Sequence, residues 1–156
     1  MCGKIASGKS TLSARLSRND HTVVIAEDDW LNALFSDQMS SIQDYVRCAA
    51  KLREVIAPHV IALLQAGVSV VLDFQANTTQ SRDWMRGLIE TSGADHMLHV
   101  LDIPDATCIT RLQARNAAGD HPFAATEEQY WQLSKHFTWP DQEEGFNVVT
   151  HHDDGA

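Results

Sequence analysis

Short apolar runs alternate along the chain with segments in which apolar residues recur every three or four positions. The runs have the length of strands and fall at residues 22–26 (TVVIA), 68–74 (VSVVLDF), 96–103 and 146–150. The periodic segments have the length of helices and fall at residues 10–17, 30–35, 42–64, 79–91, 104–116 and 127–137. This alternation predicts βα units and an α/β fold with a mainly parallel sheet. Because β-branched residues follow one another in TVVIA, we expect that strand to be buried on both faces.

Proline and glycine indicate where several of these elements bend or end. Pro58 lies inside the long helix and predicts either a bend or a break there. A break would divide residues 42–64 into two helices. Gly67 is expected to stop this helix. Residues 116–123 (NAAGDHPF) contain Gly119 and Pro122 and are expected to form a loop.

The strongest chemical signal stands near the N-terminus. Residues 3–10 (GKIASGKS) match the phosphate-binding pattern GxxxxGK[ST] and run directly into the first predicted helix. In this pattern the glycines let backbone N–H groups surround a β-phosphate, the lysine reaches the β and γ oxygens, and the serine hydroxyl binds Mg²⁺. We therefore predict a site for ATP and Mg²⁺, with nucleotide-binding residues Gly3, Lys4, Ala6, Ser7, Gly8, Lys9, Ser10 and Thr11.

Through its match to GxxxxGK[ST] the chain resembles the kinase-like P-loop NTPases, which implies a three-layer fold, and the first strand of that fold is truncated in this chain. A P-loop normally follows a strand in the middle of the sheet, whereas only Met1 and Cys2 precede Gly3. Loss of that strand would leave its two neighbours without a shared partner. We expect the chain to be shortened at its N-terminus relative to a complete fold.

Acidic residues follow two of the predicted strands, at the sheet edge where open α/β folds bind ligands. Asp28 and Asp29 come directly after TVVIA, and a carboxylate there can accept the proton of an attacking hydroxyl or hold Mg²⁺. The alternative is that one of them caps the next helix. Asp73 closes the run VSVVLD, as a Walker-B acid does, and contacts Mg²⁺ in that reading. A capping role is weaker for Asp73, because Asn77 and Thr78 are better placed to cap the helix that follows.

Two arginines are candidates for contact with the triphosphate. Arg111 and Arg115 are four residues apart, and so lie on one face of a helix that enters the expected loop. On a mobile lid over residues 111–125, they could close over the phosphates and offset charge in the transition state. The alternative is an ordinary solvated basic face.

Composition narrows the class of protein. The chain has 156 residues, a mass of 17.3 kDa and 44% apolar residues, which suffice for one core, so we expect one domain over residues 1–156. Its net charge of −9 argues against a nucleic-acid partner. No apolar run has the length of a membrane span and no signal-peptide pattern is present, which favours a cytoplasmic protein without a membrane contact. Nothing in the sequence indicates an oligomeric state.

Neither the cysteines nor the histidines predict a metal or disulfide site. The three cysteines are far apart and are expected to be buried thiols. His96 and His99 are three apart in a predicted strand, and therefore on opposite faces. His151 and His152 are expected to belong to a frayed tail.

These motifs in this order resemble the small P-loop phosphotransferases, a group that includes the kinase domain of polynucleotide kinase, chloramphenicol phosphotransferase and zeta toxins. The resemblance covers nearly the whole chain, through CGKIASGKSTL, VVIAEDDWL, VVLDFQANTTQSR, RLQARN and EGF. It implies that Asp28 is the general base, Asp73 the strand-end acid, Arg82 a following basic residue, and Arg111 and Arg115 the lid arginines. Polynucleotide kinases and zeta toxins carry Arg or Lys three residues after the base, where this chain has Leu31, which argues against a nucleotide acceptor.

The primary expectation is ATP-dependent phosphoryl transfer to a hydroxyl of a small molecule. Acidic residues between Glu127 and Glu144, with Trp131 and Trp139 among them, could form an acceptor wall for a cationic polyol such as an aminoglycoside antibiotic. The alternative for this segment is a solvated helix face with its tryptophans in the core. Two other functions stay open: a kinase acting on a nucleotide, nucleoside or RNA end, and an ATP-binding module that transfers nothing.

Overall fold

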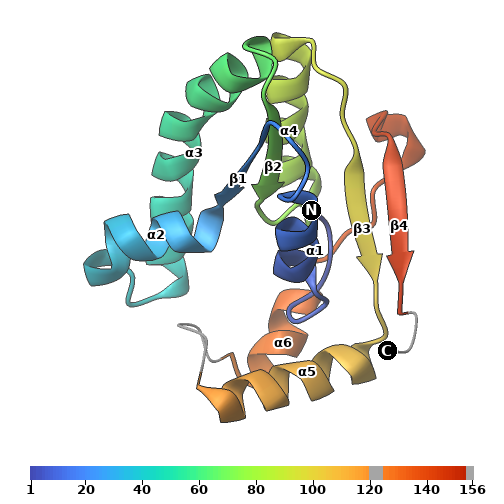
Figure 1. The fold of residues 1–156 in the computed structure, drawn as a ribbon. Coiled ribbons are helices and arrows are strands. Elements are labelled where there is room, and N and C mark those ends of the chain that lie inside the picture. The colour runs from blue at the N-terminus through green and yellow to red at the C-terminus, as the bar shows by residue number, and fades with distance from the viewer. Residues whose placement is uncertain (120–124, 154–156) are drawn as a thin grey trace. The chain divides into compact units, whose positions relative to one another are not determined.

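The computed structural model describes residues 1–119 and 125–153 (Figure 1). Its strands are β1 (Thr22–Ala26), β2 (Ser69–Asp73), β3 (Leu98–Asp102) and β4 (Val148–His152). Its α-helices are α1 (Lys9–Leu16), α2 (Glu27–Phe35), α3 (Ile42–Gln65), α4 (Thr79–Ser92), α5 (Asp105–Ala118) and α6 (Glu127–Ser134). Two short 3₁₀ helices are η1 (Ser36–Gln38) and η2 (Gln142–Glu144). The predicted α/β class is confirmed.

The predicted break at Pro58 is wrong, because α3 runs through this residue as one helix. Pro58 lies on the exposed face, where water can satisfy the carbonyl that the proline leaves without an N–H donor. On the opposite face Leu52, Ile56 and Val60 are each at most 2% exposed. Burial of this apolar face therefore holds the helix together on both sides of the proline.

The chain divides into two compact units. Unit 1 comprises residues 1–12, 75–83 and 96–156, and unit 2 comprises residues 13–74 and 84–95. In unit 2, β1 and β2 lie side by side and parallel, with Thr22 opposite Ser69 and Ala26 opposite Asp73. Val23 on β1 is 39% exposed, so the expected burial of both strand faces is wrong at that position.

Unit 1 carries the second parallel pair, in which Leu98 lies opposite Val148 and Asp102 opposite His152. Cys2 adds a single bridge to Val100: its N–H donates to the His99 carbonyl at 2.8 Å, and its carbonyl accepts from the Leu101 N–H at 2.8 Å. The phosphate-binding motif therefore starts from a backbone position fixed beside β3.

The two C-terminal histidines belong to β4, and the expectation of a frayed tail is wrong. Pairing with β3 continues to His152, whose Nδ1 lies 3.4 Å from Asp102 Oδ2. His151 Nε2 lies 2.9 Å from Nδ1 of His99 on the neighbouring strand. The described residues contain no group of three or more metal-ligating side chains.

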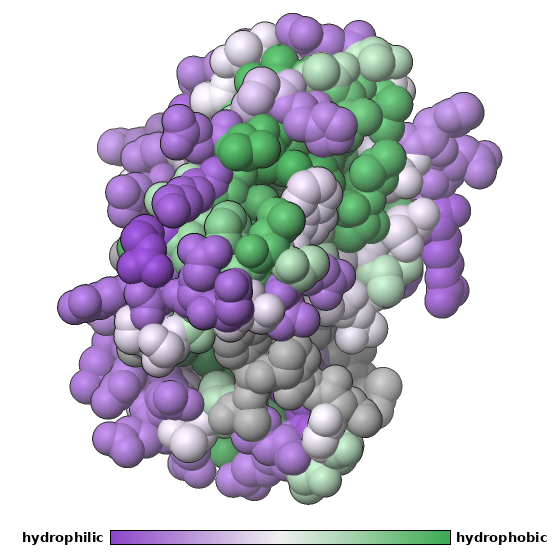
Figure 2. Space-filling view, turned by 90° about the vertical axis from the view of Figure 1, so that its left-hand side faces the viewer, coloured by the Kyte–Doolittle hydropathy of each residue, from purple (hydrophilic) through white to green (hydrophobic). Residues whose placement is uncertain are grey.

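The burial pattern confirms the interpretation of the cysteines, since Cys2, Cys48 and Cys108 are all buried free thiols. In unit 2, several large apolar side chains stay exposed on α2 and α3, including Leu34 at 53% and Val55 at 69%. Figure 2 shows hydrophobic surface on the side of the molecule where these helices lie. Over the part of the chain that the structure describes, no helix combines the length and apolar character needed to cross a membrane.

Candidate functional site

The backbone of the GxxxxGK[ST] segment forms a tight loop that leads into α1. The Ser7 N–H donates to the Lys4 carbonyl at 3.2 Å, and Ala6 and Gly8 both have positive φ, of 58° and 102°. A Cβ placed on Gly3 would lie 2.6 Å from Ser7 Oγ and 3.2 Å from Leu101 Cβ. The first glycine therefore avoids a close approach to Ser7 and Leu101, and the second allows the positive φ of the backbone.

Side chains around this loop fit a bound phosphate chain. Lys9 Nζ donates to the carbonyls of Gly3 at 2.7 Å and Lys4 at 2.8 Å, so its side chain folds back over the loop. Ser7 Oγ is buried and accepts no hydrogen bond from the described residues. Ser10 and Thr11 are exposed in the first turn of α1, where backbone N–H groups lack intrahelical partners. These donors and the open hydroxyls suit the phosphates of ATP, with Ser10 as a ligand for Mg²⁺.

Asn77 holds the start of the loop. Its Oδ1 accepts from the Gly3 N–H at 2.8 Å, and its Nδ2 donates to the Gly3 carbonyl at 3.0 Å. The expected capping role falls to Thr78, whose Oγ1 accepts from the Ser81 N–H at 3.2 Å. The sequence assigned both residues to the helix end, and no local signal distinguished the one that reaches across 74 positions.

The loop contacts α5 and α6 through the side chain of Lys4. Lys4 Nζ donates to Asp105 Oδ1 at 2.5 Å, and the Tyr130 hydroxyl donates to the same oxygen at 2.5 Å. Lys4 and then Tyr130 lower the pKa of Asp105 below its ordinary value. The side chain of Lys4 is thus directed at α5, and its expected place among the nucleotide-binding residues rests on its backbone.

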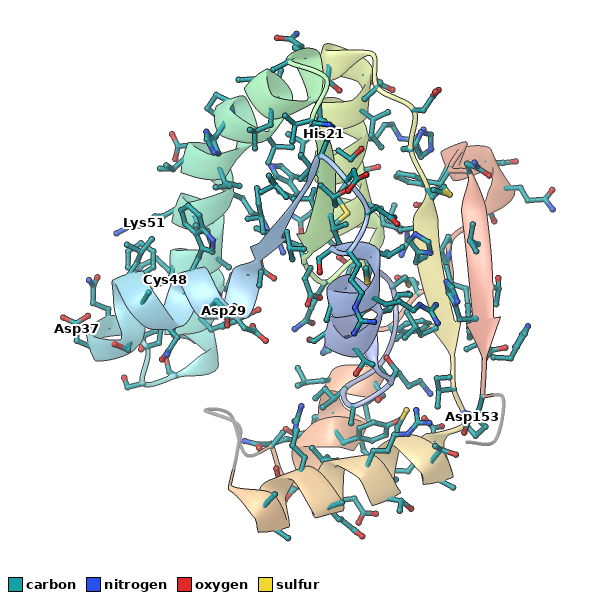
Figure 3. All side chains as sticks on the ribbon, viewed as in Figure 1. His21, Asp29, Asp37, Cys48, Lys51 and Asp153 are labelled. Carbon is teal, nitrogen blue, oxygen red and sulfur yellow. The ribbon has the colours of Figure 1, made fainter. Side chains whose placement is uncertain are left out.

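In unit 2 the candidate acids lie at one edge of the β1–β2 pair. Asp28 and Asp29 are exposed in the first turn of α2, and Figure 3 labels Asp29 there. The residue at the cap position is Ala26, which makes no side-chain cap hydrogen bond, so the capping alternative for the two aspartates is wrong. Asp73 is partly buried at the end of β2, directly opposite Ala26. The register thereby brings Asp73 to the same sheet edge as the start of α2.

Sequence reasoning missed the residue that fixes the start of α2. Glu27 is 1% exposed, and its Oε1 accepts from Arg53 Nε at 3.2 Å and Nη2 at 3.1 Å. The Arg53 guanidinium lies 5.5 Å from the centroid of the Trp84 ring. Burial first, and then the charges of Glu27 and Asp28, raise the pKa of Tyr45 on α3. A buried charge pair of this kind is invisible in the sequence, because Glu27 reads there as one more acid in EDD.

The candidate arginines lie on α5, whose buried residues are Cys108 and Leu112. Arg111 is exposed, and its Nη2 donates to Asp153 Oδ1 at 2.9 Å; Figure 3 labels Asp153 just beyond β4. Arg115, one turn further along α5, is partly buried. Residues 116–118 continue the helix and Gly119 closes it with φ of 72°, so the expected loop starts later than predicted. Residues 120–124 of the expected lid lie outside the described residues.

Arg82 is a structural residue. Its side chain is fully buried, and Nε and Nη2 donate to the two carboxylate oxygens of Glu144 at 2.6 and 2.7 Å. Its Nη1 also donates to the carbonyls of Ala76 and Thr138 at 3.0 and 2.9 Å. Glu144 is therefore committed to this pair and does not belong to an acceptor wall.

The remaining residues of the expected acceptor region divide between surface and core. Trp131 is 44% exposed and Trp139 is 54% exposed, so the alternative that placed both tryptophans in the core is wrong. Tyr130 takes the buried position on α6. In unit 2, Leu31 is fully buried and is a core residue. An apolar groove of about 430 Å³ in that unit is lined by Trp30, Leu34, Phe35, Lys51, Leu52, Glu54 and Val55.

Three solved structures with this fold are described as kinases, each at low sequence identity. A protein from Chloroflexus aurantiacus, provisionally described as a kinase, has a TM-score of 0.74 and 17% identity, over 99% of this chain and 84% of that one. A sugar kinase from Janibacter has a TM-score of 0.62 and 16% identity, over 97% and 82% of the two chains. The APS kinase of Mycobacterium tuberculosis, solved with AMPPNP and APS, has a TM-score of 0.57 and 17% identity, over 99% and 87%. These similarities confirm the predicted P-loop kinase fold.

At the level of sequence, no protein with a curated description matches this chain significantly. A family model described as AAA domain matches residues 1–140, which include the phosphate-binding loop, both candidate acidic segments and both candidate arginines. The chain therefore belongs to this AAA domain family (AAA_33), within the P-loop NTPase fold, and it resembles the small P-loop kinases.

Proposed function

We propose that this protein transfers the γ-phosphoryl group of ATP to a hydroxyl of a small molecule, as one kinase-like domain over residues 1–156. The observation that carries the proposal is the conformation of the loop of residues 3–10. Gly3 packs closely against Ser7 and Leu101, Ala6 and Gly8 have positive φ, and Lys9 Nζ donates to the Gly3 carbonyl. Such a loop is built for a phosphate chain.

Each candidate residue has a role in this proposal. ATP is held by the loop amides and Lys9, and Ser10 binds Mg²⁺, with Asp28 and Asp73 as further candidate ligands. Bound Mg·ATP supplies the phosphoryl group and neutralises charge on the β and γ oxygens. Asp28 accepts the proton of the acceptor hydroxyl, and Arg111 and Arg115 stabilise negative charge on the transferred group.

The acceptor is proposed to be small. A net charge of −9 opposes the approach of a polyanion, and the similar sugar kinase and APS kinase are named for small-molecule substrates. Glu127, Glu128 and Trp131 are all exposed on α6, which suits a cationic polyol, and an aminoglycoside antibiotic is the first candidate to test.

The test is incubation of the protein with Mg·ATP and a panel of acceptors: aminoglycosides, neutral sugars, nucleosides and a short RNA. Mass spectrometry of each acceptor is expected to show a gain of one phosphate on a small hydroxyl compound. Phosphate on the nucleoside or RNA would instead establish the alternative kinase function. ADP without a phosphorylated acceptor across the whole panel would identify a non-transferring ATP-binding module.

Two substitutions assign the roles of the neighbouring acids. Asp28→Asn is expected to lower kcat by at least about a hundredfold, in the range for loss of general-base catalysis. Asp29→Asn is the matched control, since it neutralises an equally exposed acid in the same turn and is expected to stay within about threefold of wild type. Full activity of the Asp28 variant would refute its assignment as the base.

A further inference from the structure

We propose that Asp105 is a positioning residue that ties the nucleotide-binding loop to the α5–α6 helix pair, so that Lys4 acts as a strut of the loop rather than as a phosphate ligand. This inference rests on the proposed binding of ATP to residues 3–10. It adds a role for three side chains, Lys4, Asp105 and Tyr130, none of which stands at a fixed position of the phosphate-binding pattern.

Three segments of the chain meet at one oxygen of Asp105. Lys4 comes from the loop, Asp105 from the first turn of α5 and Tyr130 from α6, and both donors reach the same carboxylate oxygen, each at 2.5 Å. Asp105 is the first residue of its helix and makes no capping bond, because the cap position is Pro104. Its carboxylate therefore serves the contact between the three segments.

An apolar contact lies beside this carboxylate. Cys108, Leu112 and Tyr130 form a buried cluster, each at most 1% exposed. The loop residues Ile5 and Ala6 pack directly against it. Two consecutive residues of the phosphate-binding loop are thus part of its interface with α5 and α6, and this contact holds the loop against the two helices.

The α5–α6 pair is also held together at its other end. Asn116 Nδ2, near the end of α5, donates to the Ala125 carbonyl at 2.8 Å, immediately before the capping residue of α6. The hydrogen bonds at the two ends hold α5 and α6 against each other. Because α5 carries Arg111 and Arg115, the tether also sets where these arginines stand relative to the loop within unit 1.

The experiment measures the Kd for Mg·ATP by titration calorimetry on the full chain carrying Lys4→Met, Lys4→Arg or Asp105→Asn. If Lys4 and Asp105 form a strut, Lys4→Met and Asp105→Asn both weaken ATP binding, by about three- to tenfold, because either change frees the loop. Lys4→Arg keeps a donor for the carboxylate and is expected to restore the Kd to within about twofold.

The sign of the Asp105 effect separates this role from simple electrostatics. If Lys4 held a phosphate directly, Asp105→Asn would release its amine and remove a nearby negative charge, so that ATP would bind more tightly. Tighter or unchanged binding in the Asp105 variant therefore overturns the proposal. Asp102→Asn is the control, since it neutralises an exposed acid on β3 and is expected to leave the Kd unchanged.

Tyr130→Phe tests the third side chain and gives a second measurement. It is expected to raise the Kd for Mg·ATP less than Lys4→Met does. In the variant that carries both changes, the rise in Kd is expected to be smaller than the product of the two single rises, because both donors act through one oxygen. The exposed Trp131 ring lies edge-on to Tyr130 at 5.3 Å, so its emission is expected to change when ATP binds, and to change less in Lys4→Met at saturating ATP. Multiplicative effects with an unaltered emission change would also overturn the proposal.

The two proposals fail in different ways. If the wild-type protein binds Mg·ATP but phosphorylates no acceptor, only the transfer function is refuted, and the Kd comparison still decides the role of Asp105. If the wild-type protein transfers phosphate and Asp105→Asn binds ATP normally, only the strut is refuted. Should Asp105→Asn fail to fold, the comparison of Lys4→Met, Tyr130→Phe and their double variant decides, since a lysine that held phosphate directly would act independently of Tyr130 and give multiplicative effects. The Lys4 side chain is 26% exposed and is expected to tolerate substitution.

Discussion

Single residues in the loop are under opposing local demands, and Ala6 illustrates this most clearly. It has φ of 58°, in a region that costs an L-residue about 1–2 kcal/mol, while its methyl group packs on the cluster of Cys108, Leu112 and Tyr130. The buried contact and the neighbouring hydrogen bonds hold a backbone conformation that alanine alone would avoid.

A substitution at Ala6 separates these terms. Glycine relieves about 1–2 kcal/mol of strain, but it loses the methyl contact, about 0.8 kcal/mol, and adds about 0.5–1 kcal/mol of chain entropy to the unfolded state. These terms nearly cancel, so Ala6→Gly is expected to change the free energy of unfolding by less than about 0.8 kcal/mol in urea denaturation. Ala114→Gly, on the exposed face of α5, has no strain to relieve and is expected to cost about 1 kcal/mol. Equal losses at the two positions would contradict this account.

At the scale of elements, hydrophobic period and local end signals explain most of the structure. Residues 22–26 form β1 with the predicted bounds, and residues 105–116 lie within α5. The failures came where a distant contact decides the outcome. Asn77 reaches Gly3 across 74 positions and Arg82 reaches Glu144 across 62, and neither separation leaves a periodic trace in the sequence. Likewise, only packing shows that Pro58 falls on the solvent side of α3.

The N-terminus of α6 gives a prediction at this scale. Thr126 Oγ1 accepts from the Gln129 N–H at 3.2 Å, and the Gln129 side chain accepts from the Thr126 N–H at 2.9 Å, which is a complete capping box. Thr126→Ala is expected to lower the free energy of unfolding by about 1 kcal/mol. Thr110→Ala removes the same atoms from an exposed position inside α5 and is expected to be neutral or slightly stabilising. Thermal melting of both variants measures the difference.

For the whole molecule, acidic residues dominate the charge, and two of them have lowered pKa values in the folded state. Ser41 and Ser40, more than Arg47, lower the pKa of Asp44 to about 2, and Lys4 and Tyr130 lower that of Asp105. Because a depressed folded-state pKa means that the unfolded chain binds protons first, the stabilisation is complete above the ordinary value of 3.8 and is lost as pH falls below it.

Acid unfolding measures this contribution directly. The free energy of unfolding is expected to fall between pH 4 and about pH 2, in the window that the shift of Asp44 sets. In Asp105→Asn the fall is expected to be shallower over the same range, since one shifted carboxyl group is gone. Urea titrations at several pH values compare the two slopes, and identical slopes would mean that Asp105 does not contribute.

The two hydrogen bonds between Asn77 and Gly3 limit which side chains can replace Asn77. A primary amide offers one donor and one acceptor side by side, so this side chain imitates the peptide group of an adjoining strand and gives Gly3 both partners of a β-ladder from a single residue. Aspartate has the same shape but lacks the donor, and it would place an anion where phosphates are to bind. The chemistry of the head group therefore opposes aspartate at this position, although the position lies outside the phosphate-binding pattern.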